Sequence, residues 1–402
     1  SPASNTVQSE DYQIETQNIV YVSSTGAGNM DGTSESTAFG NFGVAMSNIT
    51  SEGDKLIIVG AITPDGANLT TKDFAFTIEG LDTSSTLTGK DASSRLFTIN
   101  GTSSANVTFK NLTFLNNTTT LLAGGGVFFN NMAGASATFE NCTFTGNSAS
   151  NNAGGGAILV SNGNLTITDC VFEDNTSTDK GGAIVAGNFA NVNISGSLFN
   201  GNSATRGGAI AVTSDGVDFV LNNSTFVNNT ATSDGGAMYL GGSNAKSSIT
   251  NTTVFNNKVI YSTLNQSRGG GIRIEGNRTF TISNSLIYGN IVDDGNGTNT
   301  SDMGLSNNTI LTLDHSITKK VLPTLDDTAG DDFSTSIVSA DLTSSNLTFN
   351  STSGNVEYVA VNFTEDSPID FGSDGNDAGS WDSGLALSLD KQDVLAANVL
   401  VF

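Results

Sequence analysis

Short alternations of apolar and polar residues recur along most of the chain, and they predict β-strands that each bury one face. Between about residues 107 and 305 they form one repeated unit, in which an apolar residue is followed three positions later by Asn. The pairs are Phe114 and Asn117, Phe144 and Asn147, Phe172 and Asn175, Phe199 and Asn202, Phe226 and Asn229, Val254 and Asn257, and Ile287 and Asn290. Successive Asn residues are 27 to 33 positions apart. The chain therefore contains a structural repeat.

Two further patterns recur along the repeats. Three residues before the apolar anchor lies a residue type that tolerates left-handed backbone angles: Asn111, Asn141, Asp169, Gly196, Asn223, Asn251 and Asn284. Six of the seven units close on paired glycines before another short apolar strand: GGGV at 124–127, GGAI at 155–158, 181–184 and 207–210, GGAM at 235–238 and GGGI at 269–272. These glycines predict a sharp corner at which another backbone approaches closely.

A unit of three short strands cannot bury its inner face alone, but stacked units bury it against one another. We therefore predict an all-β fold, a single-stranded right-handed parallel β-helix (solenoid) of about ten coils with an N-terminal cap. Phe would lie on Phe inside, and each Asn would bond the Asn of the next coil through its side-chain amide. A leucine-rich horseshoe would need a helix and a Leu-x-x-Leu-x-Leu consensus in each repeat, and neither is present.

The pattern loosens outside the repeats, which divides the chain into five parts. Strand-like segments at 19–22 and 55–59 flank a short amphipathic segment near 42–50. We predict an N-terminal segment and cap at 1–54, irregular first coils at 55–106 and regular repeats at 107–305. We also predict irregular C-terminal coils at 306–389, with a long loop excursion from the rod at 320–345, and a hydrophobic tail at 390–402.

Composition narrows the classes of function. The 402 residues include 15 basic and 39 acidic side chains, a net charge of −24, which disfavours nucleic acid and anionic membranes as partners. No apolar run reaches the roughly 20 residues that a membrane-spanning helix needs. A single His, His315, disfavours a Ser-His-Asp triad or a histidine metal cluster. The 23 Phe residues predict a large apolar core, whereas sugar-binding surfaces usually use Tyr and Trp.

The paired GGA(I/V/M) and F-x-x-N elements resemble the repeats of the polymorphic membrane protein family of bacterial autotransporter adhesins. The resemblance rests on 155–158, 181–184, 207–210 and 235–238 together with the Phe–Asn pairs, and it extends over about half of the chain. It implies a β-helix and a surface location more directly than it implies any one activity.

Two further sets of residues occupy equivalent positions in successive repeats. Cys142 and Cys170 would lie one above the other, either as a disulfide or, as we favour, as reduced thiols in a small-residue core column. Just before the glycine pairs come Lys180, Arg206, Asp234 and Arg268. They would either receive an external carboxylate or, as we favour, form a solvated edge that Asp234 interrupts.

Calcium is the only cofactor that the sequence raises. Asp374, Asn376 and Asp377 form an oxygen-rich, glycine-containing loop, and the loop around Asp31 is similar in character, although neither matches a full consensus. The alternative is an ordinary acidic turn. Loop sequons at Asn265, Asn296 and Asn299 are candidate N-glycosylation sites.

The residues assemble no catalytic group, since Glu140, Asp169 and Glu173 are isolated carboxylates. We therefore expect a non-catalytic extracellular or cell-surface protein, exported with removal of a signal peptide, that acts as an adhesin or a structural element. The alternative is a glycan-active enzyme, a polysaccharide lyase or glycoside hydrolase on a β-helix. Expected partners are a surface glycan or protein and further copies of the chain, joined at the rod ends. A candidate donor strand for such a polymer is the apolar tail, with Val394, Leu395, Val399, Leu400, Val401 and Phe402.

Overall fold

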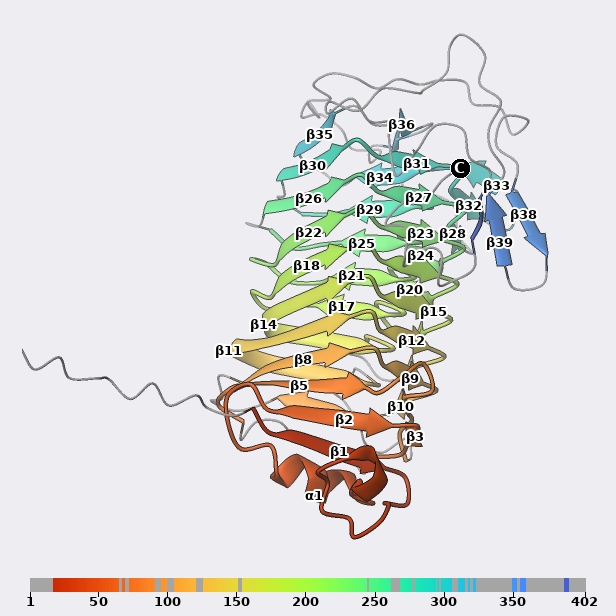
Figure 1. Ribbon diagram of the computed structural model, residues 1–402. Helices are drawn as coiled ribbons and strands as arrows, with labels where there is room; N and C mark the ends of the chain where they lie inside the picture. The colour runs from red at the N-terminus through yellow and green to blue at the C-terminus, as the bar shows by residue number, and fades with distance from the viewer. Residues whose placement is uncertain are drawn as a thin grey trace, which may run out of the picture.

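The chain is wound into a rod of stacked coils in the computed structural model (Figure 1). Most of residues 17–322 are described, and beyond them only the strands β38 (Phe349–Thr352), β39 (Asn355–Tyr358) and β40 (Leu387–Leu389), which pair antiparallel with one another. The gaps within 17–322 are 65–66, 69–71, 91–94, 100–104, 121–125, 151–153, 244–245, 262–267, 277–278, 294, 296–297, 306–309, 315–316 and 319–320.

The largest sheet has 19 strands and contributes two rows to each coil. The long row consists of β1 (Ile19–Ser23), β2 (Lys55–Val59), β5 (Ala75–Gly80), β8 (Asn106–Lys110), β11 (Phe128–Glu140), β14 (Ile158–Thr168), β18 (Asn191–Ser195), β22 (Asp218–Asn222), β26 (Lys246–Thr250), β30 (Thr279–Ser283) and β35 (Ile310–Asp314). The short row consists of β4 (Ala67–Asn68), β7 (Phe97–Ile99), the first residues of β11 and β14, β17 (Ile184–Ala186), β21 (Ile210–Val212), β25 (Met238–Leu240), β29 (Ile272–Ile274), β34 (Met303–Leu305) and β37 (Val321–Leu322).

Two further sheets close the coil. The ten-stranded sheet contains β3 (Ala61–Ile62), β6 (Thr86–Leu87), β9 (Thr113–Leu115), β12 (Thr143–Thr145), β15 (Val171–Glu173), β19 (Leu198–Asn200), β23 (Thr225–Val227), β27 (Thr253–Phe255), β31 (Leu286–Tyr288) and β36 (Ile317–Thr318). The eight-stranded sheet contains β10 (Thr118–Thr119), β13 (Ser148–Ala149), β16 (Thr176–Ser177), β20 (Ser203–Arg206), β24 (Thr230–Asp234), β28 (Lys258–Ile260), β32 (Ile291–Asp293) and β33 (Thr298–Thr300).

Equivalent strands of successive coils pair in parallel, as the repeat predicts. Phe144 of β12, for example, is in register with Phe172 of β15, which is in register with Phe199 of β19. The exception within the coils is β33, which pairs antiparallel with β32. Seven coils of the β-helix are regular, and less regular coils precede and follow them. The predicted count of about ten coils includes the irregular ones.

Stacked rings fill the interior. The rings of Phe144, Phe172, Phe199 and Phe226 lie one above the next, with centroids 4.4 to 4.7 Å apart and planes within 4° of parallel. All four are fully buried. This column confirms the prediction on which the architecture depends.

A ladder of buried Asn side chains runs beside the rings. Asn202 illustrates the pattern: its Nδ2 donates to Oδ1 of Asn229 at 2.9 Å and to the Phe172 carbonyl at 2.9 Å. Its Oδ1 accepts from Nδ2 and the backbone N–H of Asn175. The ladder extends from Asn117 to Asn290, where Oδ1 of the buried Asp302 is the last acceptor, at 3.1 Å from Asn290 Nδ2. Each amide thus serves as both donor and acceptor, and no buried amide in it is left unpaired.

The N-terminal end of the rod is covered by a short helix, α1 (Phe42–Ser47), preceded by the 3₁₀ turn η1 (Glu35–Thr37) (Figure 1). Asn41 caps α1 by accepting a hydrogen bond from the backbone N–H of Val44 at 2.9 Å. Phe42 and Met46 are buried, and the Phe42 ring lies 6.0 Å from that of Phe97. The amphipathic segment predicted near 42–50 therefore closes the open end of the core.

Candidate functional site

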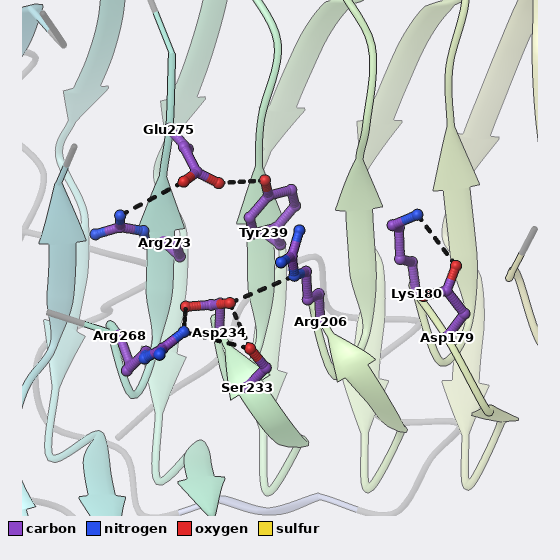
Figure 2. A network of polar contacts seen from close by, with 9 residues as sticks. All are labelled: Asp179, Lys180, Arg206, Ser233, Asp234, Tyr239, Arg268, Arg273 and Glu275. Carbon is purple, nitrogen blue, oxygen red and sulfur yellow. Dashed lines mark hydrogen bonds and ion pairs between the residues drawn. The ribbon is translucent and has the colours of Figure 1, made fainter. Parts of the chain in front are cut away.

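A network of charged side chains lies at the corner between the eight-stranded sheet and the short row (Figure 2). Lys180, Arg206 and Asp234 follow one another in register, so the predicted stacking of this column is correct. The glycines that follow fix the corner. Gly207 has φ +62°, and a Cβ on Gly208 would lie 2.1 Å from the carbonyl oxygen of Gly236. We call Arg206, Asp234, Tyr239, Arg268, Arg273 and Glu275 the corner cluster (Figure 2).

Asp234 lies between two guanidinium groups. Its Oδ1 is 2.8 Å from NH1 of Arg268, and its Oδ2 is 3.4 Å from Nε of Arg206. The Ser233 hydroxyl donates to Oδ2 at 2.6 Å. The side chains of Asp234 and Arg268 are only 8% and 12% exposed. The interpretation of this column as a solvated edge is therefore wrong at these two residues, because the opposite charges pair and exclude water.

A second layer of the corner cluster comes from the outward-facing positions of the short row. In earlier coils Leu159, Val185 and Ala211 form a small apolar cluster there, separate from the main core, and Tyr239 completes it. The Tyr239 ring lies 5.4 Å from the Arg206 guanidinium, and its hydroxyl donates to Oε2 of Glu275. Glu275 also lies 3.7 Å from NH2 of Arg273, whose NH1 donates to the Leu305 carbonyl at 3.1 Å.

Burial sets the protonation of this layer. Burial raises the pKa of Tyr239, and the hydrogen bond to Glu275 raises it further, so the phenol keeps its proton at neutral pH. Burial lowers the pKa of Arg273, which nevertheless stays charged because an Arg starts far above neutrality. The corner cluster has three cations and two anions, a net charge of +1 on an acidic chain. Its paired side chains bind coils together, and the half-exposed Arg206 is the group best placed to meet an outside carboxylate.

The sequence alone did not identify Tyr239, Arg273 and Glu275. Their only signal is that an aromatic and then a cationic residue replace Leu, Val and Ala in one outward column of the short row. That signal becomes visible once the coils are aligned in register.

The two cysteines are free thiols, both fully buried in the small-residue column, as predicted. The backbone N–H of Cys142 donates to Sγ of Cys170, and the N–H of Cys170 donates to the Ser197 hydroxyl at 3.1 Å. Ser197 and Ser224 continue the same pattern. The thiols thus take the place of the hydroxyls that accept these bonds in later coils, and burial raises the pKa of Cys170.

The calcium candidates Asp374, Asn376 and Asp377 lie outside the described residues. In the Asp31 loop, the carboxylate accepts hydrogen bonds from the backbone and hydroxyl of Thr33 and from Asn29, and these bonds lower its pKa. Among the described residues no group of three or more His, Cys, Asp or Glu side chains is placed to hold a metal ion.

The remaining predicted sites are largely outside the described part of the chain. Asn265 and Asn296 fall in gaps, and the tail with Val394, Leu395, Val399, Leu400, Val401 and Phe402 lies beyond the last described strand. Asn299 belongs to β33, where its backbone is in register with Val292. Glycosylation and strand donation therefore stay predictions.

Comparisons with known proteins agree with the fold. Residues 75–226 match the family model of the right handed beta helix region, and residues 223–239 match that of the Chlamydia polymorphic membrane protein repeat. The predicted resemblance to these repeats is thereby confirmed, and the solenoid is right-handed. The fold and the repeat together indicate a surface protein. Within the described residues, none of the helices has the length and apolarity needed to cross a membrane.

No curated protein matches the chain. Among solved structures, the crystal structure of pectate lyase Pel9A is similar at 15% identity and a TM-score of 0.35, over 94% of this chain and 95% of that one.

Proposed function

We propose that this chain is an extracellular surface protein whose rod acts as an adhesive or structural element. The observation that carries the proposal is the outer surface of the regular coils, where uncharged polar side chains bond one another from coil to coil. Asn141 Nδ2 donates to Asn111 Oδ1 at 2.8 Å, and Asn191 Nδ2 donates to Asn164 Oδ1 at 3.0 Å. Thr176 and Ser148 bond through their hydroxyls on another face. Such columns stiffen the rod and display repeated polar groups to a partner.

For the alternative, a glycan-active enzyme, the candidate site among the described residues is the corner cluster. A lyase needs a side chain that accepts a proton at neutral pH. The raised pKa of Tyr239 keeps it a donor, and Asp234 is held between two guanidinium groups. These contacts favour a clamp between coils over a proton-transfer site, and the Arg206 guanidinium is likewise engaged, by Asp234 and by the Tyr239 ring.

The two functions differ in a direct assay. Purified full-length chain is coated on beads, and the beads are offered to target cells and to insoluble polysaccharides, while soluble pectin and alginate are incubated with the free protein. We expect bead attachment and no release of unsaturated or reducing sugar ends. If the wild type cleaves any polysaccharide and Tyr239→Phe does not, the proposal is overturned in favour of the enzyme.

The proposal also includes self-assembly through the apolar tail and N-glycosylation of the loop sequons, most of which lie outside the described residues. Deletion of residues 390–402 tests strand donation by the tail. A chain that still forms the same polymers in negative-stain images without these residues would remove the tail from the proposal, and the adhesive role would stand.

A further inference from the structure

Phe189 differs from the Phe residues that fill the core of this protein, because it lies on the surface. It lies in the loop between β17 and β18, and its side chain is 71% exposed, more than any other large apolar residue that the structure describes. The stacked Phe residues inside the rod have no exposure at all. A single exposed apolar residue is ordinary on a protein surface, but this one is held by an unusual backbone conformation and by the neighbouring coil.

The backbone at this position is unusual for an aromatic residue. Asn188 and Phe189 both have positive φ, +47° and +63°. Apart from Phe189 and Met30, every non-glycine residue with positive φ among those described is Asn or Asp, the types that tolerate this conformation. The loop therefore holds an aromatic side chain outward at a cost in conformational free energy, which is typical of functional positions.

The next coil is shaped to accept the ring. Asn191 is in register with Asp218, so Phe189 lies beside Gly216, the equivalent residue of the following coil. A Cβ on Gly216 would lie 2.3 Å from Cδ1 of Phe189. Part of the ring thus packs against bare backbone, and the rest of it meets solvent as a fixed flat apolar surface.

Two hydrogen-bond acceptors lie next to this contact along the chain: Asn188 directly precedes Phe189, and Asp215 directly precedes Gly216. The Asn188 side chain donates through Nδ2 to the Ser161 hydroxyl at 2.7 Å, and Oδ1 of Asp215 accepts from the backbone N–H of Ser243 at 2.7 Å. The opposite oxygens, Asn188 Oδ1 and Asp215 Oδ2, have no hydrogen-bond partner among the described residues. An exposed aromatic ring with amide and carboxylate residues next to it suits a sugar ring, which has an apolar C–H face and hydroxyl donors at its rim.

We propose that Phe189, Asn188 and Asp215 form a binding site for a neutral hexopyranose unit of a glycan. The sugar packs its C–H face on the Phe189 ring and donates hydroxyl hydrogen bonds to the two free oxygens. Acidic sugars are excluded because Asp215 lies in the loop before β22 and Asp218 begins that strand, on a chain whose net charge is −24. The inference rests on the adhesive form of the proposed function and names its ligand class.

The test uses the full chain and neutral gluco-, galacto- and manno-configured oligosaccharides, with acidic oligosaccharides as a charge control. Binding is detected by saturation transfer from protein to sugar and quantified by titration. Phe189→Ala is expected to weaken binding of a neutral sugar about tenfold or more, whereas Phe189→Trp retains it. The matched control is Ile260→Ala, another exposed apolar residue, 48% exposed, on a different sheet, which is expected to leave binding unchanged.

A second variant separates loss of the ring from loss of the fold. Gly216→Ala keeps the ring but displaces it, and should also weaken binding; because Gly216 has φ +70°, which strains an Ala, its unfolding curve is measured as well. Unfolding curves should show Phe189→Ala as stable as the wild type. Equal affinities of the wild type and Phe189→Ala, or a wild type that binds no neutral sugar, would refute the inference. If a wild type that binds no neutral sugar still attaches to cells, the inference fails and the proposed function survives. If the wild type instead cleaves a neutral sugar that it binds through Phe189, the proposed function fails and the inference survives.

Discussion

Two columns of stacked side chains in this molecule differ in composition: one repeats the same residue in every coil, and the other changes from coil to coil. Inside the rod, Asn occupies every step of the ladder from Asn117 to Asn290. At the glycine corner, the residues change from coil to coil: Lys180, Arg206 and Asp234 are in register, and Arg268 follows just before the next glycine pair. Successive strands are about 4.8 Å apart in both columns.

The difference follows from what each side chain offers its own copy. An amide has a donor and an acceptor, so Asn can stack on Asn without limit and without charge. A guanidinium repels a guanidinium, so Asp234 alternates in sign with Arg206 and Arg268. Lys180, a cation in register with Arg206, pairs instead with Asp179 of its own coil. The outer column of Glu79, Lys110 and Glu140 alternates in the same way, with Lys110 and Glu140 at 2.7 Å. Residues that can hydrogen-bond to their own copy therefore repeat from coil to coil, whereas charged residues change so that opposite charges pair.

The largest expected effect comes from the ring column. Phe199→Ala should lower the free energy of unfolding by about 4 kcal/mol, because it opens a cavity between the parallel rings of Phe172 and Phe226. Phe189→Ala removes the same side chain from the surface and should change it by less than about 0.5 kcal/mol. Urea unfolding followed by circular dichroism measures both. Similar losses in the two variants would contradict the account of the core.

The ladder itself is tested by Asn202→Ala. This change removes the acceptor of two donors of Asn175 and the donor to the Phe172 carbonyl, all buried. We expect a loss of about 3 kcal/mol, since each unsatisfied buried group costs about 1 to 3 kcal/mol. The matched control is Asn200→Ala on the outward side of the same turn, for which little change is expected. A tolerated Asn202→Ala would mean that water or a neighbour replaces the amide.

The alternating column is tested by Asp234→Ala. Without the carboxylate, Arg206 and Arg268 face each other, and the free energy of unfolding should fall by about 2 kcal/mol. The loss should shrink as salt rises, because salt screens the repulsion between the two guanidinium groups. Asp234→Arg should be worse than Asp234→Ala. Equal stability of the two variants would show that charge alternation does not matter at this corner.

The smallest expected effect depends on pH. The pKa of Asp169 is raised by burial and by the nearby charge of Glu140. The folded state thus binds this proton more tightly than the unfolded state, and the free energy of unfolding falls as pH rises through the titration of the group. Asp169→Asn places at this turn the residue found at Asn141, which has φ +51°. We expect a small gain in Tm at neutral pH that disappears in acid.

Asp82→Asn is the control for that experiment, because its sign is opposite. Hydrogen bonds from Ser84 lower the pKa of Asp82, so its carboxylate stabilises the fold above the titration range and the benefit is lost in acid. The variant should lose Tm at neutral pH only. Shifts of the same sign in the two variants would contradict the assignment of causes.

The same distinction explains how far the sequence predicted this structure. The rings of Phe144 to Phe226 and the Asn ladder could be predicted because identical residues recur in step with the coils. The corner cluster could be predicted only in part: Arg206, Asp234 and Arg268 precede the glycine pairs in step with the coils, but Tyr239, Arg273 and Glu275 each appear once and meet only after the chain has wound through successive coils. Phe189 was missed for a related reason: neither its exposure nor its backbone angle follows from composition, which predicts Phe inside.

The direction of the ladder has a mechanical consequence. Hydrogen bonds between coils run along the axis of the rod, so a pull on its two ends loads every interface between coils in series. All interfaces then carry the same force, and the weakest one parts first. In the second half of the rod the ring stack ends at Phe226, and Val254 and Ile287 take the place of the aromatic rings. A stretched molecule should open there, coil by coil, while the Phe-lined half stays wound.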